Sequence, residues 1–127
     1  MSDGHATGAS EIREFFARKA ARVARERREL LLQAQLDAGV IVEFIIKTYN
    51  PSRIFQWGSL VHTQRFTERS DIDVAIEGLA HPLDLHRIID YAESVTQFPV
   101  DIVPIEEIDP VYADSIRANG KIVYERK

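Results

Sequence analysis

Residues 71–76 read Asp-Ile-Asp-Val-Ala-Ile, so that branched apolar residues alternate with two carboxylates and an alanine. Alternate side chains of a β-strand point to opposite faces of a sheet, and this stretch therefore predicts a strand whose branched residues enter the core. Asp71 and Asp73 then project together from the other face. Carboxylates this close repel each other, and a divalent cation such as Mg²⁺ would remove the conflict. Two solvated aspartates on a half-exposed strand are the alternative interpretation.

A second apolar stretch carries one further carboxylate. Residues 99–104 read Pro-Val-Asp-Ile-Val-Pro, with Asp101 as the single charged position. If this strand lies beside the first, Asp101 joins Asp71 and Asp73 on one face. Three carboxylates can hold two metal ions about 3.5–4 Å apart, the spacing that clamps the attacking and leaving oxygens of a phosphoryl displacement. Taken alone, Asp101 is equally well explained as an edge-strand residue.

A Gly-Ser pair, Gly58-Ser59, directly follows another predicted strand at residues 53–57. Glycine lets the backbone approach an anion closely, and successive N–H groups in such a turn form an anion-binding nest. Gly-Ser is also a common turn pair without any ligand. The combination is more specific than its parts: a Gly-Ser turn at a strand end, then Asp-x-Asp at the start of the next strand, then a third aspartate on a later strand.

The remaining pattern predicts an α/β (α+β) domain with a small mixed, mostly antiparallel sheet and helices on one face. A long proline-free helix is expected from Ser10 to Tyr49, with Phe16, Val23 and Leu30 at seven-residue spacing and a possible break at Gly39. Strands are expected at 53–57, 71–76, 100–105 and 121–125, and further helices at 83–98 and from 108 to just before Gly120.

Composition narrows the class of protein. The chain has 127 residues, no cysteine, and a formal net charge of −4, which excludes disulfides and thiolate metal sites. It shows no apolar run long enough to span a membrane and no signal-peptide pattern, so a cytoplasmic protein is expected. Residues 9–29 hold seven basic and four acidic residues. This segment predicts a solvated helix face or a contact with a partner, whereas the acidic remainder argues against a general nucleic-acid binder.

Together Gly58-Ser59, Asp71-Ile72-Asp73 and Asp101 resemble the motif of the DNA polymerase beta-type nucleotidyltransferase superfamily. The small size is similar to its minimal nucleotidyltransferase branch, whose members commonly serve as antitoxins of HEPN–MNT toxin–antitoxin pairs. The resemblance covers roughly residues 53–125. These would be the catalytic core of a single domain at 10–127, with 10–50 as a helical extension and 1–9 as a flexible tail.

The resemblance implies a role for each matching residue. Gly58 and Ser59 would hold the triphosphate of a nucleotide, most simply ATP. Asp71 and Asp73 would ligate two Mg²⁺ ions, and Asp101 would ligate the catalytic ion and help to activate the acceptor hydroxyl. Many minimal members follow Gly-Ser with an arginine and a further Arg-Gly, but residues 60–64 here contain no arginine. Arg65 and Arg69 are the candidates for that phosphate contact.

The predicted function is transfer of a nucleoside monophosphate, AMP from ATP, onto an acceptor hydroxyl. The resemblance implies a tyrosine of a HEPN-type toxin as the acceptor. Two alternatives stay open: a binding module that neutralises its partner by contact with a weak or inactive site, and nucleotidyl transfer to a small molecule. The long N-terminal helix could pack against a partner or a second copy of the chain, so a homo-oligomer is also possible.

Overall fold

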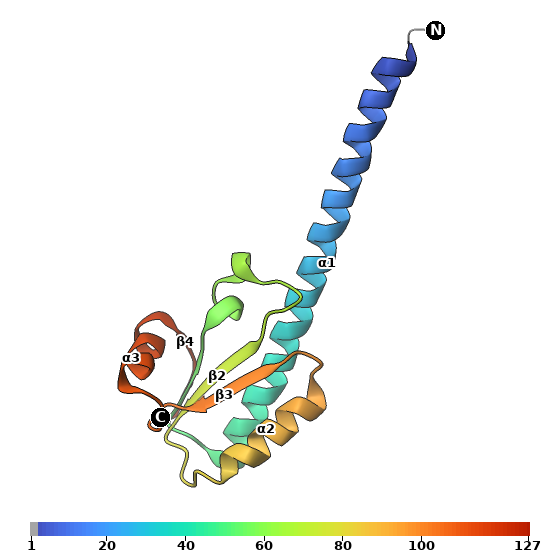
Figure 1. Cartoon of the computed structure of the whole chain (residues 1–127). Coiled ribbons are helices and arrows are strands. Elements are labelled where there is room, and N and C mark those ends of the chain that lie inside the picture. The colour runs from blue at the N-terminus through green and yellow to red at the C-terminus, as the bar shows by residue number, and fades with distance from the viewer. Residues whose placement is uncertain (1–2) are drawn as a thin grey trace.

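The computed structural model describes residues 3–127, with side chains from residue 8 onward. The chain forms three helices and four strands in the order that the sequence predicted (Figure 1). Two short 3₁₀ turns, Gly58–Leu60 and Thr63–Arg65, lie in the loop between the first two strands. The elements are α1 (Asp3–Tyr49), β1 (Arg53–Gln56), β2 (Ile72–Glu77), α2 (Asp84–Val95), β3 (Val100–Pro104), α3 (Pro110–Asn119) and β4 (Lys121–Glu125).

The four strands form one mixed sheet in the order β3-β2-β1-β4. β1 pairs antiparallel with both β2 and β4, whereas β2 and β3 are parallel. Parallel neighbours need a crossover connection, and α2 supplies it. The predicted fold class is confirmed. The parallel pair also fixes the register that matters for the site, because Asp73 and Asp101 are direct partners across it.

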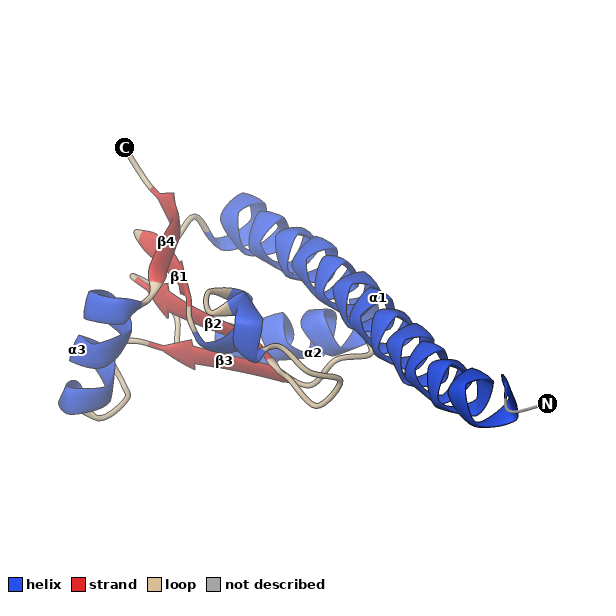
Figure 2. Cartoon of the chain, turned by 90° about the horizontal axis from the view of Figure 1, so that it is seen from above, coloured by secondary structure: helices blue, strands red, loops and turns tan. Residues whose placement is uncertain are grey.

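The main core lies on the face of the sheet that α1 and α2 cover (Figure 2). The branched residues of the 71–76 stretch are fully buried there, as the alternation predicted. They pack against the C-terminal half of α1 and one side of α2. The central buried residues of this core are Ala34, Ala38, Ile41 and Ile45 of α1, Ile54 of β1, Ile72, Val74 and Ile76 of β2, and Ile88 and Ala92 of α2.

The third helix occupies the opposite face of the sheet, so the expectation of helices on one face describes α1 and α2 but not α3. Ala113 and Ile116 of α3 pack with Phe55, Ala75 and Ile105 in a smaller buried cluster. Short alternating strands with buried residues on both faces do not reveal from the sequence which face a later helix will cover. The carboxylates of Asp71 and Asp73 belong to this second face, beside the part that α3 covers.

An ion-pair network fixes α3 to the sheet. Glu77, at the end of β2, accepts hydrogen bonds from Arg53 of β1 and from Arg117 of α3, the latter at 3.0 Å. Burial raises the pKa of Glu77, but the hydrogen bonds and positive charges of the two arginines outweigh it and the pKa is lowered overall. Glu77 is therefore held ionised, and the network leaves Asp73 as the carboxylate of β2 without such a partner.

Helix α1 begins at Asp3, within the segment expected to be a flexible tail, and Met1 and Ser2 of that tail lie outside the described residues. It continues through Gly39 without a break because Ala38 and Ile41, on either side of that glycine, are fully buried and hold the helix against the core. It ends before Asn50, whose φ of 47° turns the chain toward Pro51. Among residues 3–127, no helix has the length and apolar content needed to cross a membrane.

Ile45→Ala tests whether the C-terminal half of α1 belongs to the core. Ile45 is fully buried, so its truncation should lower the free energy of unfolding by about 2–5 kcal/mol. Leu36, on the same helix but 57% exposed, is the matched control, and Leu36→Ala should change it by less than about 0.5 kcal/mol. Urea unfolding measures both. Equal effects of the two substitutions would contradict this assignment of the core.

Candidate active site

The structure brings the predicted carboxylates together on one face of the sheet. Asp73 of β2 lies directly opposite Asp101 of β3, and Asp71 precedes β2 by one residue. Asp73 is half-buried in the central strand, whereas Asp101 is exposed on the edge strand. The strand expected at 100–105 extends over Val100–Pro104 and does lie beside the Asp-x-Asp strand. The three carboxylates therefore belong to the N-terminal end of the β2–β3 pair.

Repulsion among these carboxylates dominates the electrostatics of the site. Burial, followed by the charges of Asp101 and Asp71, raises the pKa of Asp73 to about 7. Burial and the charge of Asp71 also raise the pKa of Asp101. Every cause acting on these two groups disfavours the ionised form. Such a site gains stability from any cation that enters it.

The Gly58 turn lies against Asp73. Gly58 has a φ of +73°, a conformation that glycine adopts without strain, and a Cβ atom placed there would lie 2.3 Å from Oδ2 of Asp73. Its carbonyl accepts hydrogen bonds from the N–H groups of Val61 at 3.1 Å and His62 at 2.9 Å. These bonds close a tight turn at the end of β1, in which Gly58 lies against Asp73 and Ser59 follows it. Only glycine fits this contact.

The two candidate phosphate-binding arginines lie farther along the same loop. Arg65 ends the second 3₁₀ turn and Arg69 lies in the turn before β2; both side chains are exposed. Within the described part of the chain neither forms an ion pair, since the salt bridges involve other arginines and lysines. Their proposed contact with phosphate stays a prediction.

Sequence reasoning missed the residue that holds this loop in place. Arg27 of α1 donates from Nε to the carbonyl of Phe66 at 2.7 Å and from Nη2 to that of Thr63 at 2.8 Å. Phe66 is fully buried and packs edge-on against Phe98. From the sequence, Arg27 is one of the seven basic residues of segment 9–29, for which a solvated helix face or a partner contact is expected. Its seven-residue spacing from Ala34, which faces the core, is the signal that could have singled it out.

The chemistry of the donors fits a hard cation such as Mg²⁺, which prefers carboxylate oxygens. Within residues 3–127, however, no three histidine, cysteine, aspartate or glutamate side chains are gathered closely enough to form a complete metal cluster. Asp71, Asp73 and Asp101 would have to turn toward an ion to ligate it together.

A comparison with protein families decides what this arrangement is. The family model described as "Polymerase beta, Nucleotidyltransferase" matches residues 40–127, which include the Gly-Ser turn and all three carboxylates. The chain belongs to the polymerase beta nucleotidyltransferase family. The match begins within α1, in agreement with the packing of the C-terminal half of that helix into the core of this nucleotidyltransferase domain.

Solved structures show the same fold. One, described as "Crystal structure the toxin-antitoxin MntA-HepT", is 18% identical with a TM-score of 0.56 and aligns over 72% of this chain and 73% of its own. Another, "Crystal structure of the toxin-antitoxin with AMP-PNP", is 18% identical with a TM-score of 0.57 over 68% and 73% of the two chains. No curated protein matches the sequence of this nucleotidyltransferase.

Gly58→Ala tests the contact between the turn and Asp73. The added methyl group meets Oδ2 of Asp73 and the positive φ is strained, so we expect a loss of about 1–3 kcal/mol in the free energy of unfolding. Gly39→Ala is the matched control, because its Cβ meets nothing within 4 Å and alanine favours the helix by about 0.5–1 kcal/mol. Destabilisation by both substitutions, or by neither, would contradict the geometry.

A second test uses the raised pKa of Asp73. Because the folded protein holds this proton up to about pH 7, the contribution of Asp73 to the stability of the metal-free protein should fall as pH rises from about 4 to 7. Asp73→Asn removes this loss. Solvent screens part of this effect, because Asp73 is only half-buried. Asp73→Asn should therefore be more stable than wild type by about 1–2 kcal/mol at high pH, and the two proteins should be nearly equal in stability near pH 4.

Urea unfolding in the presence of a chelator at both ends of this pH range measures the difference. Asp90→Asn, at an exposed carboxylate on α2, is the control and should show no such trend. A stability difference between wild type and Asp73→Asn that does not change with pH would show that Asp73 titrates normally.

Proposed function

We propose that this chain is a Mg²⁺-dependent enzyme that transfers AMP from ATP to a tyrosine hydroxyl of a HEPN-type partner toxin, and so acts as an antitoxin. The observation that carries the proposal is the register of β2 and β3, which sets Asp73 opposite Asp101 with the Gly58 turn pressed against Asp73. Unpaired carboxylates beside a turn that only glycine can form do not stabilise the sheet, so their presence is better explained by a function.

Asp71, Asp73 and Asp101 would hold the Mg²⁺, which supplies positive charge to the phosphates when bound. The turn at Gly58–Leu60 would receive the triphosphate. The first N–H groups of a helical turn lack partners within it, and the side chain of Trp57 does not cap them. With the hydroxyl of Ser59, these donors can bind phosphate oxygens. Positioning and neutralisation of charge are what this chemistry requires of the protein.

In the proposed reaction, the acceptor oxygen forms a bond to the α-phosphorus of ATP while the bond from that phosphorus to the bridging oxygen of the leaving pyrophosphate breaks. Asp101, exposed at the edge of the sheet, would take the proton of the acceptor hydroxyl.

A partner toxin is the favoured acceptor. The two structural neighbours are toxin–antitoxin proteins, one of them solved with AMP-PNP, an analogue of ATP. Both facts support ATP as the donor and a toxin as the acceptor.

Calorimetric titration of ATP tests the nucleotide site. Wild type should bind ATP in the presence of Mg²⁺ and lose at least tenfold in affinity when the metal is chelated. Asp71→Asn/Asp73→Asn should bind equally weakly with and without Mg²⁺, whereas the control Asp90→Asn should behave as wild type. Failure of folded wild-type protein to bind any nucleoside triphosphate would count against a self-sufficient enzyme.

Transfer is then followed with α-labelled ATP and a candidate HEPN toxin. The proposal expects label on a toxin tyrosine, and loss of both labelling and neutralisation in Asp73→Asn. Retention of neutralisation by that variant would instead indicate an antitoxin that acts by contact alone, an alternative favoured by the lack of arginine directly after Gly58-Ser59. Label on a small molecule but not on protein would indicate a different acceptor class.

A further inference from the structure

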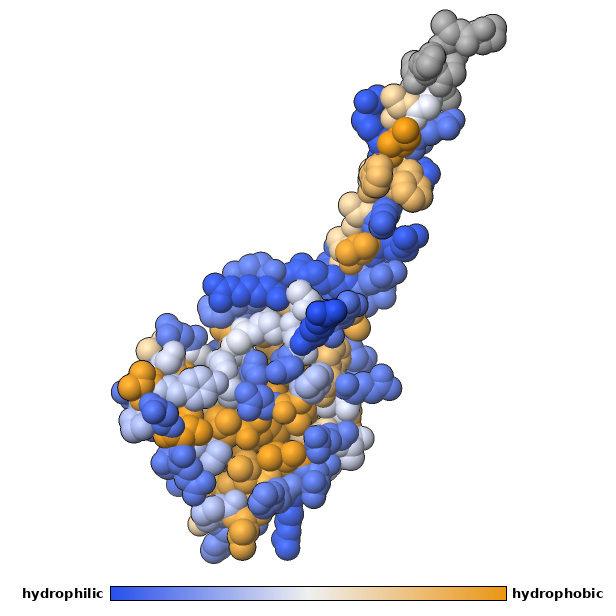
Figure 3. All heavy atoms as spheres, in the orientation of Figure 1, coloured by the Kyte–Doolittle hydropathy of each residue, from blue (hydrophilic) through white to orange (hydrophobic). Residues whose placement is uncertain are grey.

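The N-terminal half of α1 extends away from the sheet (Figures 1 and 3). We call residues 8–27 of this helix the arm. Three apolar side chains of the arm are largely exposed, namely Ile12 at 59%, Phe16 at 60% and Val23 at 53%. They lie along one side of the helix, because positions four and seven residues apart are separated by about one and two turns. Figure 3 shows this apolar stripe on the projecting helix. Exposed apolar side chains in such a row mark an interaction surface.

The charged residues that line a groove on this side of the arm are all basic. Phe16 and Val23 line a shallow groove together with two alanines and two basic residues, Lys19 and Arg27, and no acidic residue contributes to it. Arg27 is occupied by the carbonyls of the loop, which leaves Lys19 as the available charge. An occupant therefore needs an apolar surface with carboxylates at its border.

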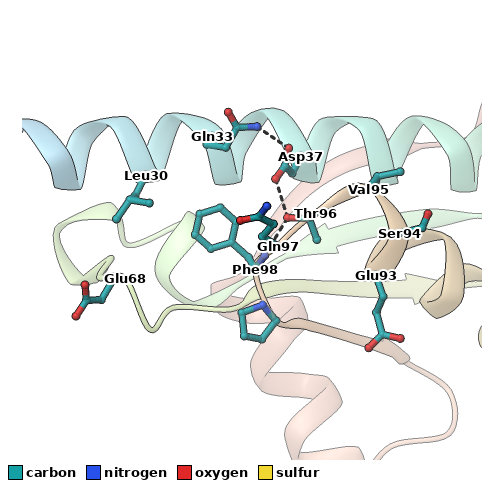
Figure 4. Close-up of a pocket in the computed structure, with 11 residues that line it drawn as sticks. Leu30, Gln33, Asp37, Glu68, Glu93, Ser94, Val95, Thr96, Gln97 and Phe98 are labelled. Atoms are coloured by element: carbon teal, nitrogen blue, oxygen red, sulfur yellow. Dashed lines mark hydrogen bonds between the residues drawn. The ribbon is translucent and has the colours of Figure 1, made fainter.

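A groove of matching character lies on the body of the same molecule. It has a volume of about 810 Å³ and lies between α1, the C-terminal end of α2 and the loop before β2 (Figure 4). Leu30 and Phe98 give it an apolar floor. Its charged residues are all acidic, namely Asp37, Glu68 and Glu93. Leu30 continues the seven-residue spacing of Phe16 and Val23, so the stripe and the groove lie along the same side of α1.

We propose that two copies of this chain pair antiparallel along α1, so that the arm of each fills the groove of the other. A two-fold axis near residue 25 would bring the region of Phe16 opposite residues 33–37 of the second copy. The apolar stripe then covers the apolar floor, and the basic arm meets the acidic border. Both contacts form twice, as a self-complementary two-fold interface requires. This pairing is independent of the proposed reaction.

A parallel pairing of the same helices is disfavoured by charge. It would place Lys19 against Lys19 and leave both acidic grooves uncovered. The antiparallel arrangement brings opposite charges together and buries the exposed rings of the arm. Electrostatic complementarity of this kind selects the orientation of an interface more than it adds affinity.

Sedimentation velocity of the full chain tests the pairing. Wild type should sediment as a dimer at micromolar concentration, and Val23→Glu should be a monomer under the same conditions. Leu36→Glu is the matched control: Leu36 is 57% exposed and lies on roughly the opposite side of α1, so this variant should remain dimeric. Lys19→Glu should raise the dissociation constant at least tenfold. Circular dichroism would verify that all variants keep the fold.

The absence of cysteine from the sequence allows a direct test of orientation. A single cysteine in place of Glu26, close to the proposed axis, should form an intermolecular disulfide on oxidation. Ile12→Cys should not, because in the antiparallel pair the two copies of residue 12 are roughly 40 Å apart at ~1.5 Å per residue. A monomeric wild type, a dimer unaffected by Val23→Glu, or efficient cross-linking through position 12 would each overturn the proposal.

Discussion

The parallel pairing of β2 with β3 is the constraint on which the rest of the structure depends. Its register places Asp73 opposite Asp101, and like charges in adjacent positions of two strands oppose folding. The remainder of the domain has to hold this pair together. α2 makes the crossover that parallel strands need, and the side chains of β2 on the far face are fully buried against α1 and α2. The same six residues, 71–76, thus supply two of the carboxylates on one face of the sheet and part of the main core on the other.

The pKa values of the two acidic residues of β2, Asp73 and Glu77, shift in opposite directions because different groups lie beside them. Glu77 is paired with Arg53 and Arg117, and this pairing lowers its pKa, whereas Asp73 has only carboxylates and a glycine turn beside it and its pKa is raised. One strand therefore carries an ion-paired carboxylate at one end and, near the other, a carboxylate whose neighbours disfavour its charge. Unpaired, half-buried charge is expensive to maintain, and its presence away from the ion-pair network is typical of functional sites.

Much of this arrangement could be predicted from the sequence. The alternation in residues 71–76 identified the strand, its buried face and two of the carboxylates, and the apolar stretch around Asp101 identified the third. What the sequence could not supply were contacts between elements distant along the chain. Arg27 looks like any other charge of a basic helix until the carbonyls of Thr63 and Phe66 lie beside it. Which face of the sheet α3 covers depends on how all four strands are paired, and no single stretch of sequence contains that information.

The two hydrogen bonds of Arg27 restrict where residues can be inserted into α1 or deleted from it. They connect the loop that carries Gly58 and Arg65 to a helix whose other end, at Ile45, is locked in the core. One residue inserted between Arg27 and Ile45 would turn the guanidinium about 100° around the helix axis, out of reach of both carbonyls. Insertions and deletions should therefore be excluded from this segment.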